Sequence, residues 1–95
     1  MNKYEAMFIV KPDLSEEDKK VLFGQIQEVI VKNGGQVLQA DIWSEKRKLT
    51  FTIKKQLEGV YYLVNLNLPT EAMAKIKYAF KLNENILWMM ILVVG

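Results

Sequence analysis

The stretch ILWMMILVV, residues 86–94, decides how the whole chain is expected to fold. Its nine consecutive apolar residues are too few for a membrane-spanning helix, which needs about twenty. A signal peptide would stand at the other end of the chain. We therefore interpret the run as a closing β-strand with apolar side chains on both faces, and we expect no membrane partner.

Length and composition limit the classes of structure and function that this chain can have. A length of 95 residues suffices for one hydrophobic core, which predicts a single domain over residues 1–95. A hydrophobic share of 51% with 25% charged residues is typical of a folded chain. Cysteine and histidine are both missing, so we predict no catalytic residue, metal ligand or cofactor. The net charge of +2 is too small to indicate a nucleic-acid partner by itself.

The first half of the chain predicts a strand, a helix and a long strand. Residues 3–10, KYEAMFIV, alternate as a strand does. Ser15 is placed to cap a helix whose apolar spacing continues up to the Asn-Gly-Gly at residues 33–35. Residues 36–53 then indicate one long, bent strand with an irregularity near Ser44 and Glu45.

The second half predicts a strand, a helix and a strand. Gly59 is expected to close a hairpin, and VYYLVNLNL at residues 60–68 follows as the third strand. Pro69 and Thr70 begin a second helix, and residues 86–94 form the fourth strand. This order predicts an α+β, ferredoxin-like βαββαβ sandwich. Its four-stranded antiparallel sheet has the order 4-1-3-2, with two helices on one face.

The other face of this sheet, here called the open face, lacks a covering element. Alternation turns Tyr4, Ala6 and Phe8 toward the helices. In the fourth strand, the side chains that should also face the helices are those of Leu87, Met89, Ile91 and Val93. The open face should then carry the apolar side chains of Met7, Ile9, Tyr61, Leu63, Trp88, Met90 and Leu92. Wet sheet faces are normally polar, and an apolar patch of this kind usually marks a protein-partner site.

Basic residues gather in EKRKLTFTIKK, residues 45–55. The cations of this run are Lys46, Arg47, Lys48, Lys54 and Lys55. Lysines on an edge strand can simply block edge-to-edge pairing. The same run can also form a strip of phosphate contacts, which gives salt-dependent affinity without base specificity. Both interpretations stay open at this point.

Two families with a related order of elements fit poorly. Acylphosphatases need an arginine in the first strand-to-helix loop, where this chain has KPDL at residues 11–14. RNA-recognition motifs stack bases on aromatic residues of strands one and three. If Gly59 is aligned with their signature glycine, the stacking positions become Val60 and Tyr62. The first of these is aliphatic and the second is expected to face inward.

Three segments, taken in order, match the pattern of one known family. Residues 1–17, MNKYEAMFIVKPDLSEE, have its Tyr-Glu opening, apolar strand and Pro-Asp turn. Residues 33–55 have its glycine, strand, tryptophan and basic run, and residues 58–93 have its Gly-Tyr-Tyr-like strand, proline-led helix and last strand. Over nearly its whole length, the chain resembles small-subunit ribosomal protein six of bacteria.

The resemblance implies a non-enzymatic structural protein of the small ribosomal subunit, located on cytoplasmic ribosomes. It implies binding to central-domain ribosomal RNA together with ribosomal protein eighteen. It makes Lys3, Lys46, Arg47 and Lys48 the RNA-contact candidates, and the phosphate-strip interpretation adds Lys54 and Lys55.

The chain departs from the family at the fourth strand, where Trp88 stands in place of a usual arginine. A basic contact is thereby lost and a large apolar one gained. The alternative function, from another class, is a self-associating interaction module. It would pair two copies through the open face or the edge of the fourth strand, giving a homodimer when isolated.

Overall fold

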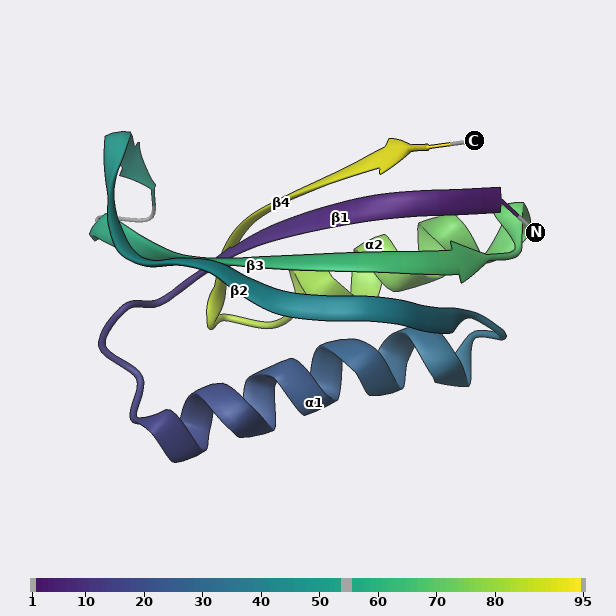
Figure 1. Ribbon diagram of the computed structural model, residues 1–95, viewed down its shortest axis with the longest axis horizontal. Helices are drawn as coiled ribbons and strands as arrows, with labels where there is room; N and C mark the ends of the chain where they lie inside the picture. Colours follow the sequence, from purple (N-terminus) through teal and green to yellow (C-terminus); the bar gives the residue numbers. More distant parts are fainter. Residues whose placement is uncertain (1, 54–55, 95) are drawn as a thin grey trace.

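The computed structural model describes the backbone of residues 2–53 and 56–94 and the side chains of residues 2–43 and 58–94. Lys54 and Lys55 therefore lie outside the described residues. The elements in chain order are β1 (Asn2–Val10), α1 (Glu16–Lys32), β2 (Gln36–Ile53), β3 (Gln56–Leu68), the 3₁₀ turn η1 (Thr70–Ala72), α2 (Met73–Lys81) and β4 (Ile86–Val93). The four strands form an antiparallel sheet in the order β2-β3-β1-β4 (Figure 1), which confirms the predicted order.

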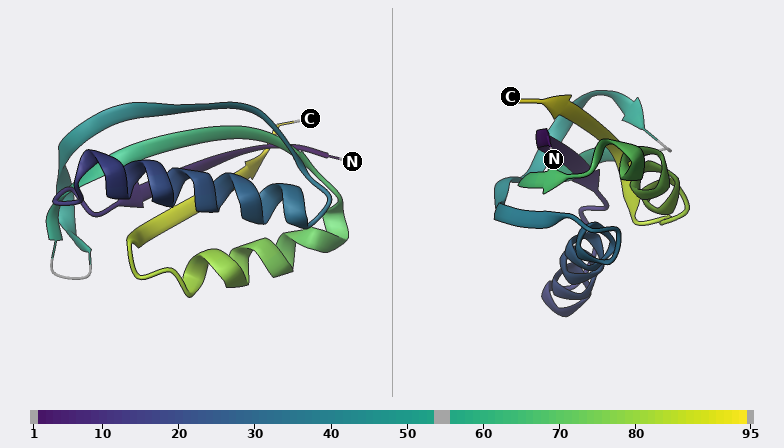
Figure 2. Two further views of the ribbon diagram at one scale, coloured as in Figure 1. Left: turned by 90° about the horizontal axis from the view of Figure 1, so that it is seen from below. Right: turned by 90° about the vertical axis from the view of Figure 1, so that its right-hand side faces the viewer.

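Both helices lie on the same side of the sheet (Figure 2), as predicted. The core fills the space between the two layers. Phe8 of β1 meets Phe80 of α2 edge-on with ring centroids 5.0 Å apart, and Phe23 of α1 stacks on Tyr62 of β3 at 3.9 Å. Such aromatic pairs stabilise a core beyond the area they bury. Within the described chain, no helix is both long and apolar enough to cross a membrane.

Helix α1 begins and ends at the residues that the sequence indicates. The Ser15 hydroxyl accepts a hydrogen bond from the Asp18 backbone N–H at 3.1 Å, which satisfies one of the free donors of the first turn. At the other end Gly34 has a φ of +84°, in the left-handed region that favours glycine. Gly35 follows against Ile30 and Leu68, where a Cβ would lie 2.8 Å from each side chain. The chain therefore turns tightly from α1 into β2.

Strands β2 and β3 pair antiparallel as predicted, but the prediction that Gly59 closes their hairpin is wrong. Gly59 is buried within β3 and pairs with Arg47, and the ladder continues beyond it to the pair Ile53 and Gln56. The register of β2 shifts on both sides of Ser44, as the sequence indicates. Such irregularities bend a strand pair, and a glycine in a strand often marks a bend of this kind. Gly59 therefore lies where the ribbon bends rather than where it turns back.

The second helix is confirmed, although its first turn is wound more tightly than expected. Residues Thr70–Ala72 form a 3₁₀ turn, with the Ala72 N–H donating to the Pro69 carbonyl at 3.0 Å. The Thr70 hydroxyl accepts a hydrogen bond from the Asn2 side chain at 3.2 Å and does not cap the helix. Short 3₁₀ turns are common at the N-termini of α-helices.

Candidate binding surfaces

The open face grades from apolar at one end to polar at the other. Side chains that are paired across the strands form rows on this face. Across β4, β1 and β3, the first row is Trp88, Ile9 and Tyr61, the second is Met90, Met7 and Leu63, and the third is Leu92, Glu5 and Asn65. Because paired residues of an antiparallel sheet share a face, the predicted apolar side chains lie side by side. Their role as a protein-partner site stays a prediction.

These apolar side chains differ in how much solvent they meet. On β4, Trp88 and Met90 are each 39% exposed and Leu92 is 49% exposed. In the middle of the sheet, Ile9 is only 4% exposed. Of these predicted side chains, the most accessible ones therefore lie along the edge strand β4.

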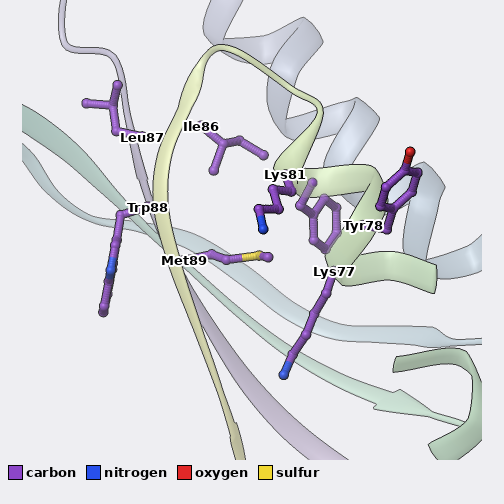
Figure 3. A pocket seen from close by; sticks show the side chains of 8 residues that line it. Lys77, Tyr78, Lys81, Ile86, Leu87, Trp88 and Met89 are labelled. Atoms are coloured by element: carbon purple, nitrogen blue, oxygen red, sulfur yellow. The ribbon is translucent and has the colours of Figure 1, made fainter. Parts of the chain in front are cut away.

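A bulge in β4 explains why Ile9 is covered. Ile9 pairs with Trp88 and Val10 pairs with Ile86, so Leu87 has no partner of its own in β1. The prediction that Leu87 faces the helices is wrong, because the bulge reverses the alternation at this point. Leu87 packs instead against Ile9 on the open face. Figure 3 shows Leu87 and Trp88 pointing away from α2, whereas Ile86 and Met89 point toward it.

Beyond the bulge, the alternation of β4 follows the prediction. Met89 and Ile91 are half-buried and pack against the main core, as expected. Val93 pairs with Tyr4 on the same side but is 68% exposed, because it ends an edge strand.

The sequence reasoning missed Trp43 as a member of the open face. Its ring meets that of Tyr61 at a centroid distance of 5.6 Å and an angle of 63°. The register shift between Val37 and Gln39 brings this about, because it reverses the alternation of β2. Beyond it Ala40 and Ile42 pair with the inward Val64 and Tyr62, and Trp43 therefore lies on the open face. The irregularity predicted from the sequence lies further along, near Ser44 and Glu45, so the sequence analysis had no signal for this earlier shift.

The basic candidates fall into two separate groups. Lys3 is exposed at the polar end of the open face, where it pairs with Asn67, and its carbonyl accepts a hydrogen bond from the Val94 N–H at 2.9 Å. The backbone of Arg47 pairs with Gly59 and that of Lys48 with Glu58, near the far end of β3. From Asn67 to Gly59 the strand rises roughly 26 Å, at about 3.3 Å per residue.

That far end of the β2–β3 hairpin carries Lys46, Arg47 and Lys48, here called the β2 cations. Figure 1 shows the hairpin end bending out of the plane of the sheet. The sheet therefore does not bring Lys3 and the β2 cations together. A polyanion that contacted both would have to extend along most of the sheet.

Comparisons with known proteins agree on one family. The family model described as Ribosomal protein S6 matches residues 3–92. The small ribosomal subunit protein bS6 of Thermoanaerobacter pseudethanolicus is 38% identical over 87 residues, which are 92% of this chain and 90% of that protein. The protein of the same name in Dictyoglomus turgidum is 41% identical over 91 residues, 96% of this chain and 93% of that one.

Among solved structures, the crystal structure of 30S ribosomal protein S6 from Thermotoga maritima has the same fold. The TM-score is 0.88, and the match covers 98% of this chain and 87% of that one. At 21% sequence identity this likeness bears on the fold alone.

Proposed function

Because this chain belongs to the ribosomal protein S6 family of the small ribosomal subunit, we propose that it binds central-domain ribosomal RNA together with ribosomal protein eighteen. The observation that carries the proposal is the family match over residues 3–92. The role is structural and not enzymatic: the protein holds RNA and a protein neighbour in place on the cytoplasmic ribosome.

The proposed RNA contacts lie at the hairpin end of the sheet. The edge strand β2 carries three successive cations there, Lys46, Arg47 and Lys48. Lys54 and Lys55 come after them in the sequence. Closely spaced cations bind phosphates and release counterions, which makes the affinity strongly salt-dependent. Lys3, at the opposite end of the sheet, would contact a second stretch of RNA.

The proposed protein contacts lie on the apolar part of the open face. Trp88, Met90 and Leu92 are exposed there in successive rows. Burying exposed aromatic and methionine side chains is typical of the centre of a protein interface. Since Trp88 stands where the family usually has an arginine, β4 would contribute to the protein partner more than to RNA.

The test is a binding titration with an RNA fragment from the central domain, with and without ribosomal protein eighteen. We expect salt-dependent binding that becomes tighter when the protein partner is present. Binding to unrelated RNA of equal length with the same affinity, whether or not the partner is present, would contradict the proposal.

A second candidate function is self-association through the open face. The exposed side chains of Trp88, Met90 and Leu92 favour it. Light scattering at low micromolar concentration distinguishes the two functions. A stable dimer that central-domain RNA does not dissociate would support self-association.

A further inference from the structure

A groove runs between α2 and the edge strand β4. Its volume is about 450 Å³. It is lined by Lys77, Tyr78, Phe80, Lys81, Ile86, Leu87, Trp88 and Met89. Figure 3 shows Ile86 and Met89 pointing into it from β4 and both lysines reaching from α2 on the same side. The groove therefore has an apolar floor and two ammonium groups at its helix side.

The backbone of β4 turns hydrogen-bonding groups toward this groove. In the described part of the chain, β4 pairs with β1 alone. The Val94 N–H donates to the Lys3 carbonyl, and hydrogen-bonded pairs alternate along an antiparallel ladder. Leu92 and Met90 therefore direct their backbone groups toward β1. Met89, Ile91 and Val93 direct theirs outward, where they can pair with another strand.

Nothing in β4 protects this edge. Natural edge strands usually avoid unwanted pairing through charged side chains, prolines or bulges along their length. The sequence of Ile86–Val93 contains no charged residue and no proline, and its register shifts only near its start, at Leu87. A long apolar edge of this kind is expected to be covered in the working protein.

The two faces of β4 define what an added strand would look like. Directly paired residues point to the same side of a sheet. A residue paired with Met89 would point toward α2, where Lys77 and Lys81 favour a carboxylate. Its neighbours would point to the open face beside Trp88 and Met90, which favour apolar side chains. Acidic and apolar residues would therefore alternate.

We propose that the β4 edge and this groove bind an extended segment of a partner protein in which acidic and apolar residues alternate. The segment adds a fifth strand to the sheet, its backbone pairs with Met89, Ile91 and Val93, and its carboxylates meet Lys77 and Lys81. Strand addition of this kind takes affinity from the main chain and specificity from alternate side chains.

Charge argues against a second copy of this chain as the occupant. Helix α2 carries Lys75, Lys77 and Lys81 and no acidic residue within Met73–Lys81. Among the described side chains, neither Lys77 nor Lys81 forms an ion pair. Pairing of two β4 edges would bring two such helices near each other, and like charges in an interface repel. An acidic segment would instead neutralise them.

The test uses the synthetic peptide acetyl-Ile-Glu-Val-Glu-Ile-Glu-Val-amide, titrated into the isotopically labelled full chain. We expect amide shifts concentrated at residues 88–93. The double substitution Lys77→Glu and Lys81→Glu should weaken binding roughly tenfold or more, because two charge-assisted contacts are lost. The matched control, Lys20→Glu with Lys32→Glu, makes the same charge change on α1 and should keep the affinity.

Two further peptides separate side-chain from backbone recognition. A version with lysine in place of each glutamate should bind at least about tenfold more weakly. A version with N-methyl groups on the three glutamates should also lose binding. These residues pair with Met89, Ile91 and Val93, and methylation removes their N–H donors to β4. Equal binding of the glutamate and lysine peptides would overturn the proposal. Full affinity in the Lys77→Glu, Lys81→Glu variant would overturn it too, as would a dimer of the chain that the peptide does not dissociate.

Discussion

The two edges of the sheet are built in opposite ways. The β2 edge, Gln36–Ile53, is 18 residues long, and its register against β3 shifts at four places. It also carries the β2 cations. The β4 edge, Ile86–Val93, is 8 residues long, has one register shift and carries no charge. One edge is closed to further strands by its irregularity and its cations, while the other is left open to them.

The difference shows that one small sheet can bind two kinds of partner at two separate edges. Cations on a bent edge discourage strand pairing and suit phosphates. A regular apolar edge with free backbone groups suits a protein segment. The four predictions below test this division, from the largest expected effect to the smallest.

Removing the β2 cations should have the largest effect. With Lys46, Arg47 and Lys48 replaced by alanine, the slope of log affinity against log salt should fall by about 2 to 3, and RNA binding at 0.15 M salt should weaken about 100-fold. A filter-binding series across salt concentrations measures both quantities. The matched control replaces Lys20, Lys32 and Lys75, which are exposed on the helices, and should change little. Equal slopes for both triple variants would exclude phosphate contacts at β2.

Trp88→Ala should weaken the protein interface by about 2 kcal/mol, the cost of a typical interface anchor. Because Trp88 is 39% exposed in the free chain, its unfolding free energy should fall by less than about 1.5 kcal/mol. Calorimetry with ribosomal protein eighteen and urea denaturation of the free chain give the two values. A loss of several kcal/mol in the free chain, with partner affinity unchanged, would place Trp88 in the core instead.

Met90→Lys gives β4 the protection that β2 already has. Light scattering during heating should show a higher onset temperature for aggregation, while the unfolding free energy changes by less than about 1 kcal/mol, since Met90 is half exposed. Leu38→Lys is the matched control, because Leu38 is exposed beside a register shift of β2. If both substitutions raised the onset equally, the two edges would not differ in their tendency to pair.

The smallest effect concerns Tyr62, which pairs with Ile42 of β2. Its hydroxyl accepts a hydrogen bond from the Gln27 side chain at 2.9 Å, and burial raises its pKa above 10.0. Since the unfolded chain releases this proton at lower pH than the folded one, stability should fall as the pH rises through and above 10.

Tyr62→Phe should remove this fall and cost about 1 kcal/mol at neutral pH, the net value of one hydrogen bond. Unfolding curves at pH 8 and at pH 10.5 to 11 compare the two proteins. An unchanged pH dependence in Tyr62→Phe would assign the effect to other groups.

The order of elements and most facing directions were predictable because they depend on local patterns. Ser15 caps α1 through the N–H three residues on, and Gly34 supplies the left-handed turn at its end. In β1 and β3 the period of two separates inward from outward side chains correctly. The family, too, could be recognised from the order of its motifs along the chain.

What failed depends on pairing between distant segments. Glycine is a residue typical of turns, but β2 and β3 stay paired beyond Gly59. Alternation along β4 places Leu87 correctly only if the strand has no bulge. The bulge is defined by how β4 pairs with β1, which the sequence of β4 does not show. How the RNA-contact candidates lie relative to one another was not predicted either, and the sheet holds Lys3 and the β2 cations at opposite ends.

The sequence by itself determined which elements form, which side chains are apolar, and that Ile86–Val93 lacks any charge. Those properties belong to single segments and to their nearest neighbours along the chain. The tertiary structure alone decided that Leu87 covers Ile9, that Trp43 joins Tyr61, and that Lys77 and Lys81 line a groove beside a free strand edge. The physical reason is that register and helix placement are set by packing between segments far apart in the chain, where a slip of one residue exchanges the two faces of a strand.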